Sequence, residues 1–334
     1  MSIPASMRAL VLEAYGQPLV SSQLPVQAPA AGQVLVRVAA SGVNPLDLKI
    51  KAGQAAHARM QPPAVLGIDL AGTVVAVGPG VTRFAPGDEV YGMTGGVGGL
   101  QGSLAEFATV DADLLALKPK NLGMRAAAAL PLIVITAWEG LVDRATVRAG
   151  QKVLVQGGAG GVGHVAIQLA RAYGAEVFAT DAAEKRAFIE SLGAVAIDYR
   201  TATVADYVAA HTAGEGFDVV YDTAGGASLD ASFAAARTYG GHVVSCLGWG
   251  THALAPLSFR AATYSGVFTL MPMLTGKGRA HHGEILTAAA ALVEAGKLTP
   301  NLDERRFTLD TVEDAHGAME NRTAQGKIVV EVAA

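Results

Sequence analysis

Cysteine is almost missing from this sequence of 334 residues, and its absence narrows the sites that the chain can build. The single Cys246 excludes a disulfide framework and any structural zinc site made of thiolates. Charged residues are also scarce, at 16%, and 29 acidic against 25 basic residues leave a net charge of −4. Without an excess of basic residues to neutralise a phosphate backbone, we expect no nucleic-acid partner.

Long hydrophobic runs are missing as well. The longest, 126–138, contains Pro131 and is far shorter than the roughly 20 residues that cross a bilayer. Residues 1–4 lack the basic and apolar regions of a signal peptide. These absences predict a cytoplasmic protein without a membrane partner.

What is abundant is apolar or small. Hydrophobic residues, at 51%, can offset the entropy of ordering, which excludes a disordered chain. The length suggests roughly two domains of about 150 residues each. There are 40 glycines without a Gly-x-y repeat, so we expect them to mark turns and close approaches of the backbone.

Two kinds of pattern follow one another along the chain. In the first third, short β-branched runs such as 34–38 and 72–77 are separated by Gly and Pro turns, which predicts a compact β-rich domain. Segment 125–141 is typical of a helix that Pro131 kinks or divides. Strands and helices then alternate, which predicts a parallel sheet covered on both faces. The predicted strands are 152–155, 176–180, 195–197, 218–221 and 242–245, and the predicted helices are 162–173, 184–192 and 229–237.

A glycine-rich turn joins the first of these strands to the first helix. Gly158, Gly160 and Gly163 fit the pattern G-x-G-x-x-G directly after the strand that ends at Val155. In this pattern the first glycine makes the tight turn, the second lets the backbone approach a pyrophosphate, and the third lets helix and strand pack closely. The helix N-terminus adds N–H groups for the phosphates. The pattern predicts a dinucleotide site, and the alternative is a glycine turn that binds nothing.

The residues after the second strand bear on which dinucleotide binds. Asp181, 18 residues after the last glycine of the motif, is placed to accept from the ribose 2′-OH of NAD. Lys185, Arg186, Tyr199 and Arg200 lie near the same region and suit the 2′-phosphate of NADP. Two or three donors outweigh one carboxylate, which favours NADP over NAD. Alternatively, Asp181 only caps the helix that follows it.

Several further motifs occur in an order that is known from one enzyme family. They are SGVNPLD at 41–47, GIDLAGTV at 67–74, FAPGDEV at 84–90, TAW at 136–138, GGVG at 160–163 and RTAQG at 322–326. With them the sequence resembles the medium-chain dehydrogenase/reductase superfamily, and within it the zinc-free quinone oxidoreductases related to zeta-crystallin. The resemblance covers almost the whole chain. It implies a homodimer of an α/β protein with a GroES-like β-rich catalytic domain (1–126, completed by 271–334) and a Rossmann domain of doubly wound parallel sheet (127–270).

The same resemblance bears on metal binding. Zinc alcohol dehydrogenases of this superfamily carry a cysteine where this chain has 42–44, and a His-Glu pair at the position of Ile68 and Asp69. Only Cys246 is available here, and it lies in the nucleotide domain after a later strand. Three ligands of the types that zinc prefers cannot be assembled at that place, so we expect no metal site.

The family's cofactor contacts carry over to individual positions of this chain. Besides the glycine loop with Gly161 and Val162 under the pyrophosphate, they are Thr180, Lys185, Tyr199 and Arg322 at the 2′-phosphate, and Thr136, Leu247, Gly248 and Phe268 around the nicotinamide. This set implies NADP(H) as the cofactor. NAD(H) is the less favoured choice, kept open by Asp181.

Hydride transfer to an electron-poor carbon needs a group that stabilises charge on the adjoining carbonyl oxygen. Without a metal, the candidates are the amide of Asn44, the carboxyl of Asp47 and the hydroxyl of Tyr91. Each has a structural alternative, because Asn44 and Asp47 suit a turn or a helix cap and Tyr91 suits packing in its strand. Quinones and α,β-unsaturated carbonyls tolerate such weak assistance best, so we expect one of them as the substrate.

Two rival functions stay open on the sequence. An enoyl-thioester reductase of the same superfamily would use the same hydride step on a longer substrate. A non-catalytic dinucleotide-binding protein would use no such step. Turnover of a panel of quinones, enones and enoyl thioesters separates these three functions.

Overall fold

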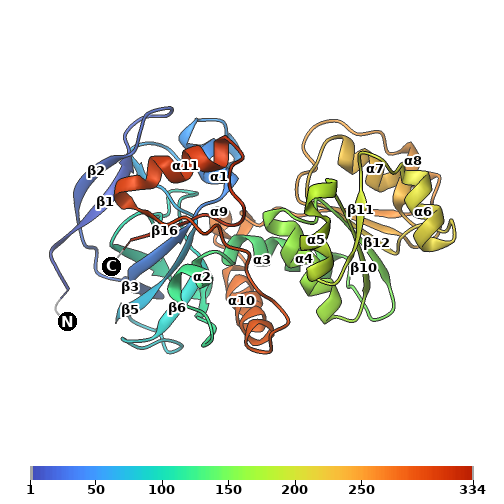
Figure 1. Ribbon diagram of the computed structural model, residues 1–334. Helices are drawn as coiled ribbons and strands as arrows, with labels where there is room; N and C mark the ends of the chain where they lie inside the picture. Colours follow the sequence, from blue (N-terminus) through green and yellow to red (C-terminus); the bar gives the residue numbers. More distant parts are fainter. Residues whose placement is uncertain (1–2, 333–334) are drawn as a thin grey trace. The chain divides into compact units, whose positions relative to one another are not determined.

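The structure is a computed structural model that describes residues 3–332, which fold as two units (Figure 1). The chain leaves the first unit at Leu132, six residues later than the boundary expected at 126, and re-enters it at Leu270. A short segment, 296–299, also belongs to the second unit. Unit 1 thus contains residues 3–132, 270–295 and 300–332, and unit 2 contains 133–269 and 296–299.

Unit 1 is built on two β-sheets. The larger one has the strand order β15-β16-β3-β5-β6-β8, with β7 paired to β3, and the smaller one has the order β2-β1-β4. All neighbouring strands are antiparallel except β15 and β16. The strands are β1 (Ser6–Leu12), β2 (Val20–Pro25), β3 (Gln33–Gly42), β4 (Ala64–Val65), β5 (Asp69–Val77), β6 (Glu89–Met93), β7 (Phe107–Asp111), β8 (Leu115–Leu117), β15 (Phe307–Thr308) and β16 (Val329–Glu331).

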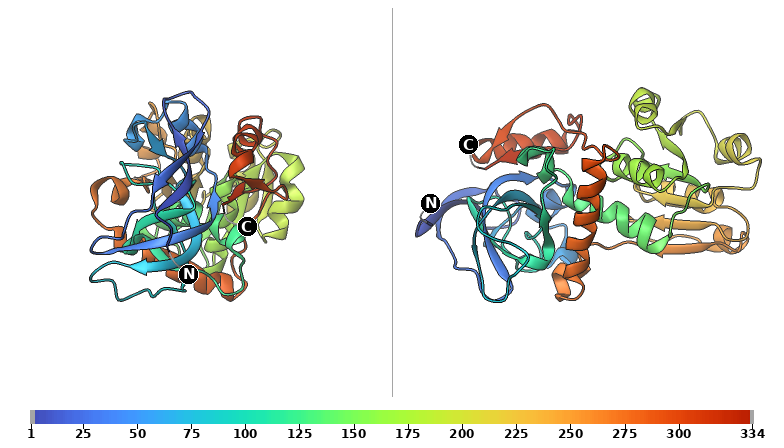
Figure 2. Two further views of the ribbon diagram at one scale, coloured as in Figure 1. Left: turned by 90° about the vertical axis from the view of Figure 1, so that its left-hand side faces the viewer. Right: turned by 90° about the horizontal axis from the view of Figure 1, so that it is seen from below.

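The core of unit 1 follows from the alternation of residues along β3. Val34, Val36 and Val38 lie on one face of this strand and are fully buried, packed with Leu70 and Val74 of β5. Helix α10 contacts β6 and β8, and Figure 2 shows it beside the strands of this unit. The helices of unit 1 are α1 (Pro45–Lys51), α2 (Met124–Ala128), α9 (Met271–Thr275), α10 (Arg279–Glu294) and α11 (Val312–Glu320), with single 3₁₀ turns η1 (Ala56–Ala58), η2 (Ala112–Leu114) and η5 (Leu309–Thr311).

The C-terminal segment completes the larger sheet of unit 1. Strand β16 pairs antiparallel with β3, in a register that places Val330 opposite Ser41. Residues just before β16 therefore lie beside those just after β3, although almost 300 positions separate them in the sequence. This pairing matters below because it brings Lys327 next to Asn44.

Unit 2 is a six-stranded parallel sheet with the order β11-β10-β9-β12-β13-β14. Numbered from its first strand, this is the order 3-2-1-4-5-6 of the doubly wound dinucleotide-binding fold, which confirms the predicted fold class. The strands are β9 (Lys152–Gln156), β10 (Glu176–Asp181), β11 (Val195–Asp198), β12 (Val219–Asp222), β13 (His242–Ser245) and β14 (Thr263–Gly266). The helices are α3 (Pro131–Trp138), which enters from unit 1, the π-helical turn η3 (Glu139–Arg144), α4 (Gly161–Ala172), η4 (Ala183–Lys185), α5 (Arg186–Ser191), α6 (Val204–Thr212), α7 (Ala227–Ala235) and α8 (Ala255–Ser258).

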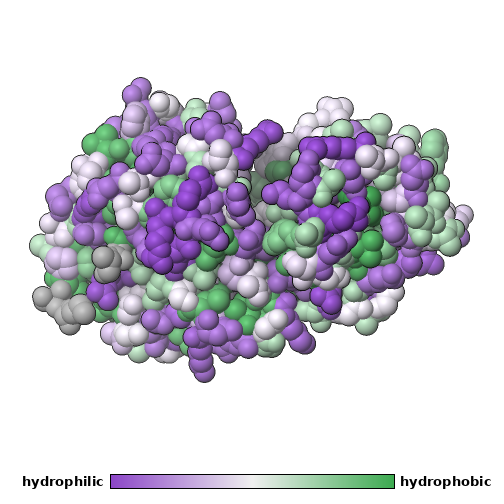
Figure 3. All heavy atoms as spheres, viewed as in Figure 1, coloured by the Kyte–Doolittle hydropathy of each residue, from purple (hydrophilic) through white to green (hydrophobic). Residues whose placement is uncertain are grey.

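Apolar side chains are gathered inside the units. In unit 2, Tyr207, Phe217 and Phe233 pack together against the sheet strands as part of one buried cluster. On the face drawn in Figure 3, hydrophilic and hydrophobic residues are interspersed over the surface. Across residues 3–332, no helix combines the length and the apolar character that spanning a membrane requires.

Candidate functional site

The glycine-rich turn lies between β9 and α4, as the motif predicts. The positive φ of the turn, +74°, occurs at Gly157, one residue before the glycine to which the motif assigns the turn. Gly158 serves packing instead, because a Cβ there would lie 2.6 Å from the Cβ of Ala179 on β10. At Gly163 a Cβ would lie 2.1 Å from the carbonyl oxygen of Gly157. Two of the three motif glycines thus let helix, turn and sheet approach closely.

The first turn of α4 is open toward the outside of unit 2. Gly160 is its N-cap, in extended backbone, and no side chain caps the helix there. Gly160 and Gly161 are exposed, and a Cβ on Gly160 would meet only the carbonyl oxygen of Gly157, at 3.2 Å. Uncapped N–H groups and the positive end of the helix dipole suit an anion such as a pyrophosphate. The residues present fit a dinucleotide.

Asp181, the last residue of β10, is bound to the backbone of the glycine turn. Its Oδ2 accepts from the N–H of Ala159 at 2.9 Å, and its Oδ1 accepts from the N–H of Ala182 at 2.9 Å. It is the N-cap of neither η4 nor α5, because Ala182 and Lys185 hold those positions and neither makes a side-chain capping bond. The carboxylate therefore fixes the backbone of the glycine turn.

Thr180 does not offer its hydroxyl to a phosphate. The side chain is 3% exposed, and Oγ1 donates to Oε1 of Gln156 on the neighbouring strand β9. The hydroxyl proton is used inside the sheet because Thr180 and Gln156 are register partners on neighbouring strands and their side chains lie side by side. We therefore leave Thr180 out of the phosphate site.

The other residues expected at the 2′-phosphate in unit 2 lie at its surface. Lys185 is exposed, and so is Tyr199, whose N–H donates to the carbonyl oxygen of Asp181 at 3.3 Å. The Arg200 guanidinium lies 5.8 Å from the centre of the Tyr199 ring and bonds Glu184 at 3.3 Å. Arg200 thus joins the group, and its position beside Tyr199 in the sequence already indicated this.

The residues expected at the nicotinamide follow the strands of unit 2. Leu247 and Gly248 come two and three residues after the end of β13 at Ser245, so they lie at the same carboxyl edge of the sheet as the glycine turn. Phe268 contacts the exposed Trp249, with ring centres 6.0 Å apart. Thr136, on α3, is 5% exposed, and its carbonyl oxygen accepts from the buried hydroxyl of Tyr221 at 2.6 Å. Arg322, expected at the 2′-phosphate, belongs to unit 1, where it follows α11 and is exposed.

Unit 1 holds a buried polar cluster, which we define as Asn44, Asp47, Asp69 and Lys327. Asn44 ends the turn after β3 and is the N-cap of α1, because Pro45 fixes the start of the helix. The Asn44 N–H donates to Oδ2 of Asp47 at 2.8 Å, in the manner of a capping box. Each of the four side chains is at most 6% exposed.

Asn44 lies between two opposite charges of this cluster. Its Nδ2 donates to Oδ2 of Asp69 at 2.9 Å, and its Oδ1 accepts from the ammonium of Lys327. The same ammonium bonds the carbonyl oxygen of Val43 at 2.9 Å, and Oδ1 of Asp69 accepts from the N–H of Leu132 at 2.9 Å. The sequence prediction contained Asn44 and Asp47 but not Lys327. The sequence feature that could have revealed Lys327 is its place at the start of an apolar strand, because a lysine that is buried there needs an acidic partner.

Burial dominates the electrostatics of the cluster. It raises the pKa of Asp47 to about 7, with the nearby Asp69 also raising it and the Asn44 N–H and Lys327 opposing. It raises the pKa of Asp69 to about 6, against Lys327 and the bonds from Asn44 and Leu132. It lowers the pKa of Lys327, which the two carboxyl groups oppose. Oδ1 of Asp47 has no hydrogen-bond partner among the described residues, which suits a carboxyl group that holds a proton near neutral pH.

Tyr91, the third predicted catalytic residue, is bound elsewhere in unit 1. It is fully buried on β6, and its hydroxyl donates to the carbonyl oxygen of Leu286 on α10 at 2.6 Å. Burial raises the pKa of the phenol far above its ordinary value. This geometry favours the packing alternative over a catalytic role for Tyr91.

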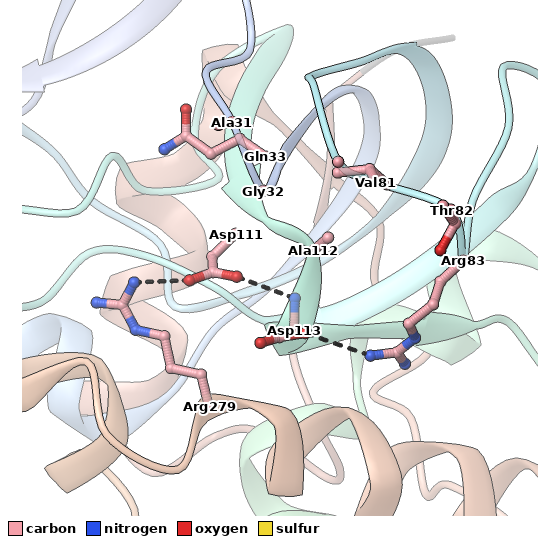
Figure 4. Close-up of a pocket in the computed structure, with 11 residues that line it drawn as sticks. Ala31, Gly32, Gln33, Val81, Thr82, Arg83, Asp111, Ala112, Asp113 and Arg279 are labelled. Atoms are coloured by element: carbon pink, nitrogen blue, oxygen red, sulfur yellow. Dashed lines mark hydrogen bonds and ion pairs between the residues drawn. The ribbon is translucent and has the colours of Figure 1, made fainter.

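A separate pocket in unit 1 offers no chemistry of this kind. Figure 4 shows its charged residues bonded to one another: Arg279 bonds Asp111 at 2.8 Å, and Arg83 lies 3.6 Å from Asp113. Both guanidinium groups face carboxylates rather than an open cavity. The pocket, of about 480 Å³, is also lined by Ala31, Gly32, Gln33, Gly80, Val81, Thr82 and Ala112.

Two family models match the chain. The model of the alcohol dehydrogenase GroES-like domain matches residues 30–120, and a zinc-binding dehydrogenase model matches residues 192–330. The first falls within unit 1, and the second extends from unit 2 into the C-terminal part of unit 1. The two models together agree with a β-rich domain that is interrupted by a nucleotide fold.

Similar proteins narrow the family further. The chain is 37% identical to 2-methylene-furan-3-one reductase of Solanum lycopersicum and 38% identical to the chloroplastic NADPH-dependent alkenal/one oxidoreductase of Arabidopsis thaliana, covering 99% and 98% of this chain and 80% of each relative. The quinone oxidoreductase of Coxiella burnetii has a TM-score of 0.83 at 28% identity, over 98% of this chain and 100% of that one. The chain belongs to the quinone oxidoreductase branch of the medium-chain dehydrogenases/reductases. An alcohol dehydrogenase superfamily protein from Novosphingobium aromaticivorans, at 58% identity and a TM-score of 0.96, covers 98% and 100% of the two chains.

Because some members of this superfamily bind zinc, the buried cluster has to be compared with what zinc needs. Zinc is held by three or four ligands from Cys, His, Asp and Glu. Among residues 3–332, no group of three or more such side chains is placed to hold a metal ion. The Lys327 ammonium, itself a cation, already bonds Asn44 and the Val43 carbonyl oxygen. The buried polar cluster of this chain does not fit a zinc ion.

Proposed function

We propose that this protein is a reductase that transfers a hydride from NADPH to a quinone or an α,β-unsaturated carbonyl compound. The observation that carries the proposal is the open, glycine-lined first turn of α4 at the carboxyl edge of a six-stranded parallel sheet. The names of the relatives from Solanum lycopersicum and Arabidopsis thaliana support the substrate class, since one names a reductase of a methylene-furanone and the other an oxidoreductase of alkenals and alkenones.

Bound at unit 2, the nicotinamide would supply the hydride, and the residues of this chain have two further tasks. The first is to hold the cofactor at Gly160, Gly161 and Val162, where the N–H groups of Gly161 and Val162 serve the pyrophosphate and that of Gly160 donates to the Gly157 carbonyl oxygen, with Leu247, Gly248, Thr136 and Phe268 toward the nicotinamide. The second is to stabilise the negative charge that appears on the carbonyl oxygen. We assign this task to the Asn44 amide. We propose that the Asp47 carboxyl group holds a proton close to this amide.

For the cofactor, Lys185, Tyr199 and Arg200 support NADPH over NADH. Two cations and a phenol at the surface next to β10 suit a phosphate that carries nearly two negative charges. Asp181 opposes them, but its oxygens already accept from two backbone N–H groups. Arg322 is kept as a further phosphate contact on the strength of the family motif alone.

The cofactor proposal is tested with variants at this surface. Lys185→Ala lowers kcat/KM for NADPH about tenfold, because a charge-assisted bond to phosphate is lost, and leaves kcat/KM for NADH unchanged. Arg186→Ala is the matched control, since that guanidinium bonds Glu190 and the Ala196 carbonyl oxygen instead. Equal losses with both cofactors for Lys185→Ala contradict the assignment.

The reaction itself is tested by following NADPH oxidation with a panel of quinones, enones and enoyl thioesters. Turnover of quinones or enones supports the proposal. Preference for the thioesters shifts the function to an enoyl-thioester reductase. NADPH binding with no turnover of any activated carbonyl leaves the non-catalytic dinucleotide-binding protein.

We also propose that the enzyme works without zinc, on the poor fit of the buried cluster to that metal. Purified protein should hold far less than one zinc per chain by elemental analysis, and a strong chelator should leave kcat unchanged. Stoichiometric zinc whose removal abolishes activity contradicts this.

A homodimer is proposed as well, from the family resemblance and from the exposed position of β14. This strand is the last of the unit 2 sheet, so one of its edges carries backbone groups that the sheet does not use.

A further inference from the structure

The Asn44 amide is held in a way that allows only one orientation. Its two ends, Oδ1 and Nδ2, have nearly the same shape, so packing alone does not distinguish them. The Lys327 ammonium, which only donates, faces Oδ1, and the Asp69 carboxylate, which only accepts, faces Nδ2. A rotation by 180° would set donor against donor and acceptor against acceptor, and the low exposure of all three side chains keeps water from compensating.

Both charged partners are themselves fixed. Asp69 is the first residue of β5, and its second carboxylate oxygen accepts from the Leu132 N–H, so a donor holds each of its two oxygens. Its backbone oxygen accepts from Ser103, which in turn bonds Ser41 of β3 at 2.7 Å. Lys327 is fixed by its second bond, to the Val43 carbonyl oxygen. The arrangement of Asp69, Asn44 and Lys327 is thus fixed by the pairing of β3, β5 and β16, and it is not a chance contact of flexible side chains.

We propose that Lys327 and Asp69 are positioning residues that lock the Asn44 amide with its oxygen toward the ammonium, so that its second Nδ2–H serves the substrate's carbonyl oxygen. The inference rests on the proposed function, which it deepens. Reversing the amide would present an oxygen to the developing negative charge, which repels it. The amide is 1% exposed, so a carbonyl oxygen that reaches it does so out of water, where such a bond is strong.

The test separates orientation from mere neutralisation of charge. Lys327→Met removes the ammonium and leaves Asp69 uncompensated, so we expect a lower melting temperature and a kcat reduced about 10- to 100-fold. Lys118→Met is the matched control. Lys118 is a lysine of the same unit whose side chain is 6% exposed and whose Nζ bonds the carbonyl oxygens of Pro119 and Leu122 and the Glu89 carboxylate. The Lys118→Met variant should have a lower melting temperature and an unchanged kcat.

The double variant Lys327→Met/Asp69→Asn decides between the two roles. An amide at position 69 keeps its oxygen for the Leu132 N–H and turns its NH₂ toward Asn44, which then has to present Oδ1. No unpaired charge is left, although the Val43 carbonyl oxygen has lost the Lys327 ammonium, so the melting temperature recovers in part from that of Lys327→Met. Because the Asn44 amide is now reversed, kcat stays low. Recovery of kcat together with stability overturns the proposal, because the pair then only balances charge.

A second measurement needs no turnover. The chain has four asparagines, Asn44, Asn121, Asn301 and Asn321, so selective ¹⁵N-Asn labelling gives four side-chain amide signals, and Asn44→Ala identifies one of them. In the wild type the two Asn44 amide protons should differ strongly in chemical shift, because one is bonded to a carboxylate. This difference should shrink in the double variant. Unchanged Asn44 shifts overturn the proposal, whereas a wild type that binds NADPH but reduces no carbonyl overturns the proposed function while these shifts still decide the orientation.

Discussion

Tyr91 shows how one hydrogen bond decides between two roles for a residue. With its hydroxyl donated to the Leu286 carbonyl oxygen, the side chain joins β6 to α10. We expect Tyr91→Phe to lower the free energy of unfolding by about 1 kcal/mol through the lost bond, and to leave kcat within about twofold of the wild type. Urea denaturation and steady-state rates measure both. A fall in kcat of about 100-fold at unchanged stability would instead support a catalytic hydroxyl.

His316 gives unit 1 a component of stability that depends on pH. The imidazole is 2% exposed on α11, and burial lowers its pKa to about 4 from 6.5, with Lys51 adding to the effect and Glu313 opposing it. The unfolded chain therefore binds the proton more tightly, and this component is intact above pH 6.5 and lost as the pH falls toward 4. Between pH 7 and pH 4.5 the loss is about 2 kcal/mol.

The free energy of unfolding is measured for the wild type and for His316→Gln at these two pH values. The difference between the two pH dependences is the contribution of His316. The exposed His281, changed to Gln, is the control and should keep the wild-type dependence within about 0.5 kcal/mol. If His316→Gln retains the full dependence, the buried imidazole is not its source.

At the same scale, the sequence indicated part of the buried cluster and missed the rest for a physical reason. Asn44 and Asp47 belong to one local motif, a cap three residues from its partner, which short-range spacing reveals. Lys327 lies 283 positions from Asn44 and reaches it only because β16 pairs with β3. Which strands become neighbours is decided by the whole fold, and no local pattern around Lys327 names its partner.

Among the elements, two glycines in helices and turns should respond to the same substitution with opposite sign. Gly158→Ala sets a Cβ 2.6 Å from that of Ala179, which should cost about 1–3 kcal/mol and weaken NADPH binding. Gly317 lies within α11, where a Cβ would meet nothing within 4 Å, so Gly317→Ala should add about 0.5–1 kcal/mol. Thermal unfolding of both variants, with and without NADPH, measures these effects. Equal shifts in one direction would show that local packing does not control either position.

Element boundaries followed the sequence where one residue type has a strong local effect. Pro131 divides the predicted helix as expected, since α2 ends at Ala128 and α3 begins at Pro131. Strand β14, Thr263–Gly266, was not predicted, because its short polar sequence has no apolar alternation. It is a strand because β13 offers it a free edge, which is again a property of the sheet and not of the segment.

For the whole molecule, the order of motifs predicted the fold class and the interruption of one domain by the other. The residues at which the chain passes from one unit to the other could not be predicted as closely. The helix α3 crosses from unit 1 to unit 2 without a glycine or a polar linker to mark the change, so the boundary at Leu132 leaves no trace in composition. The return of 296–299 to unit 2 includes Thr299, which bonds Gln168 through both its backbone groups and so depends on tertiary contact.

The proposed homodimer is the last property of the whole molecule that can be tested. The exposed edge of β14 is the surface at which two copies could pair their sheets, and charged residues on an edge strand suppress such pairing. Sedimentation should give a mass near twice 34.0 kDa for the wild type and near 34.0 kDa for Thr263→Lys. Val195→Lys, on the opposite edge strand β11, is the matched control and should stay dimeric, because Val195 is 43% exposed but its strand is not assigned to the interface. A monomeric wild type removes the dimer, and a dimer that survives Thr263→Lys but not Val195→Lys moves the interface to the other edge of the sheet.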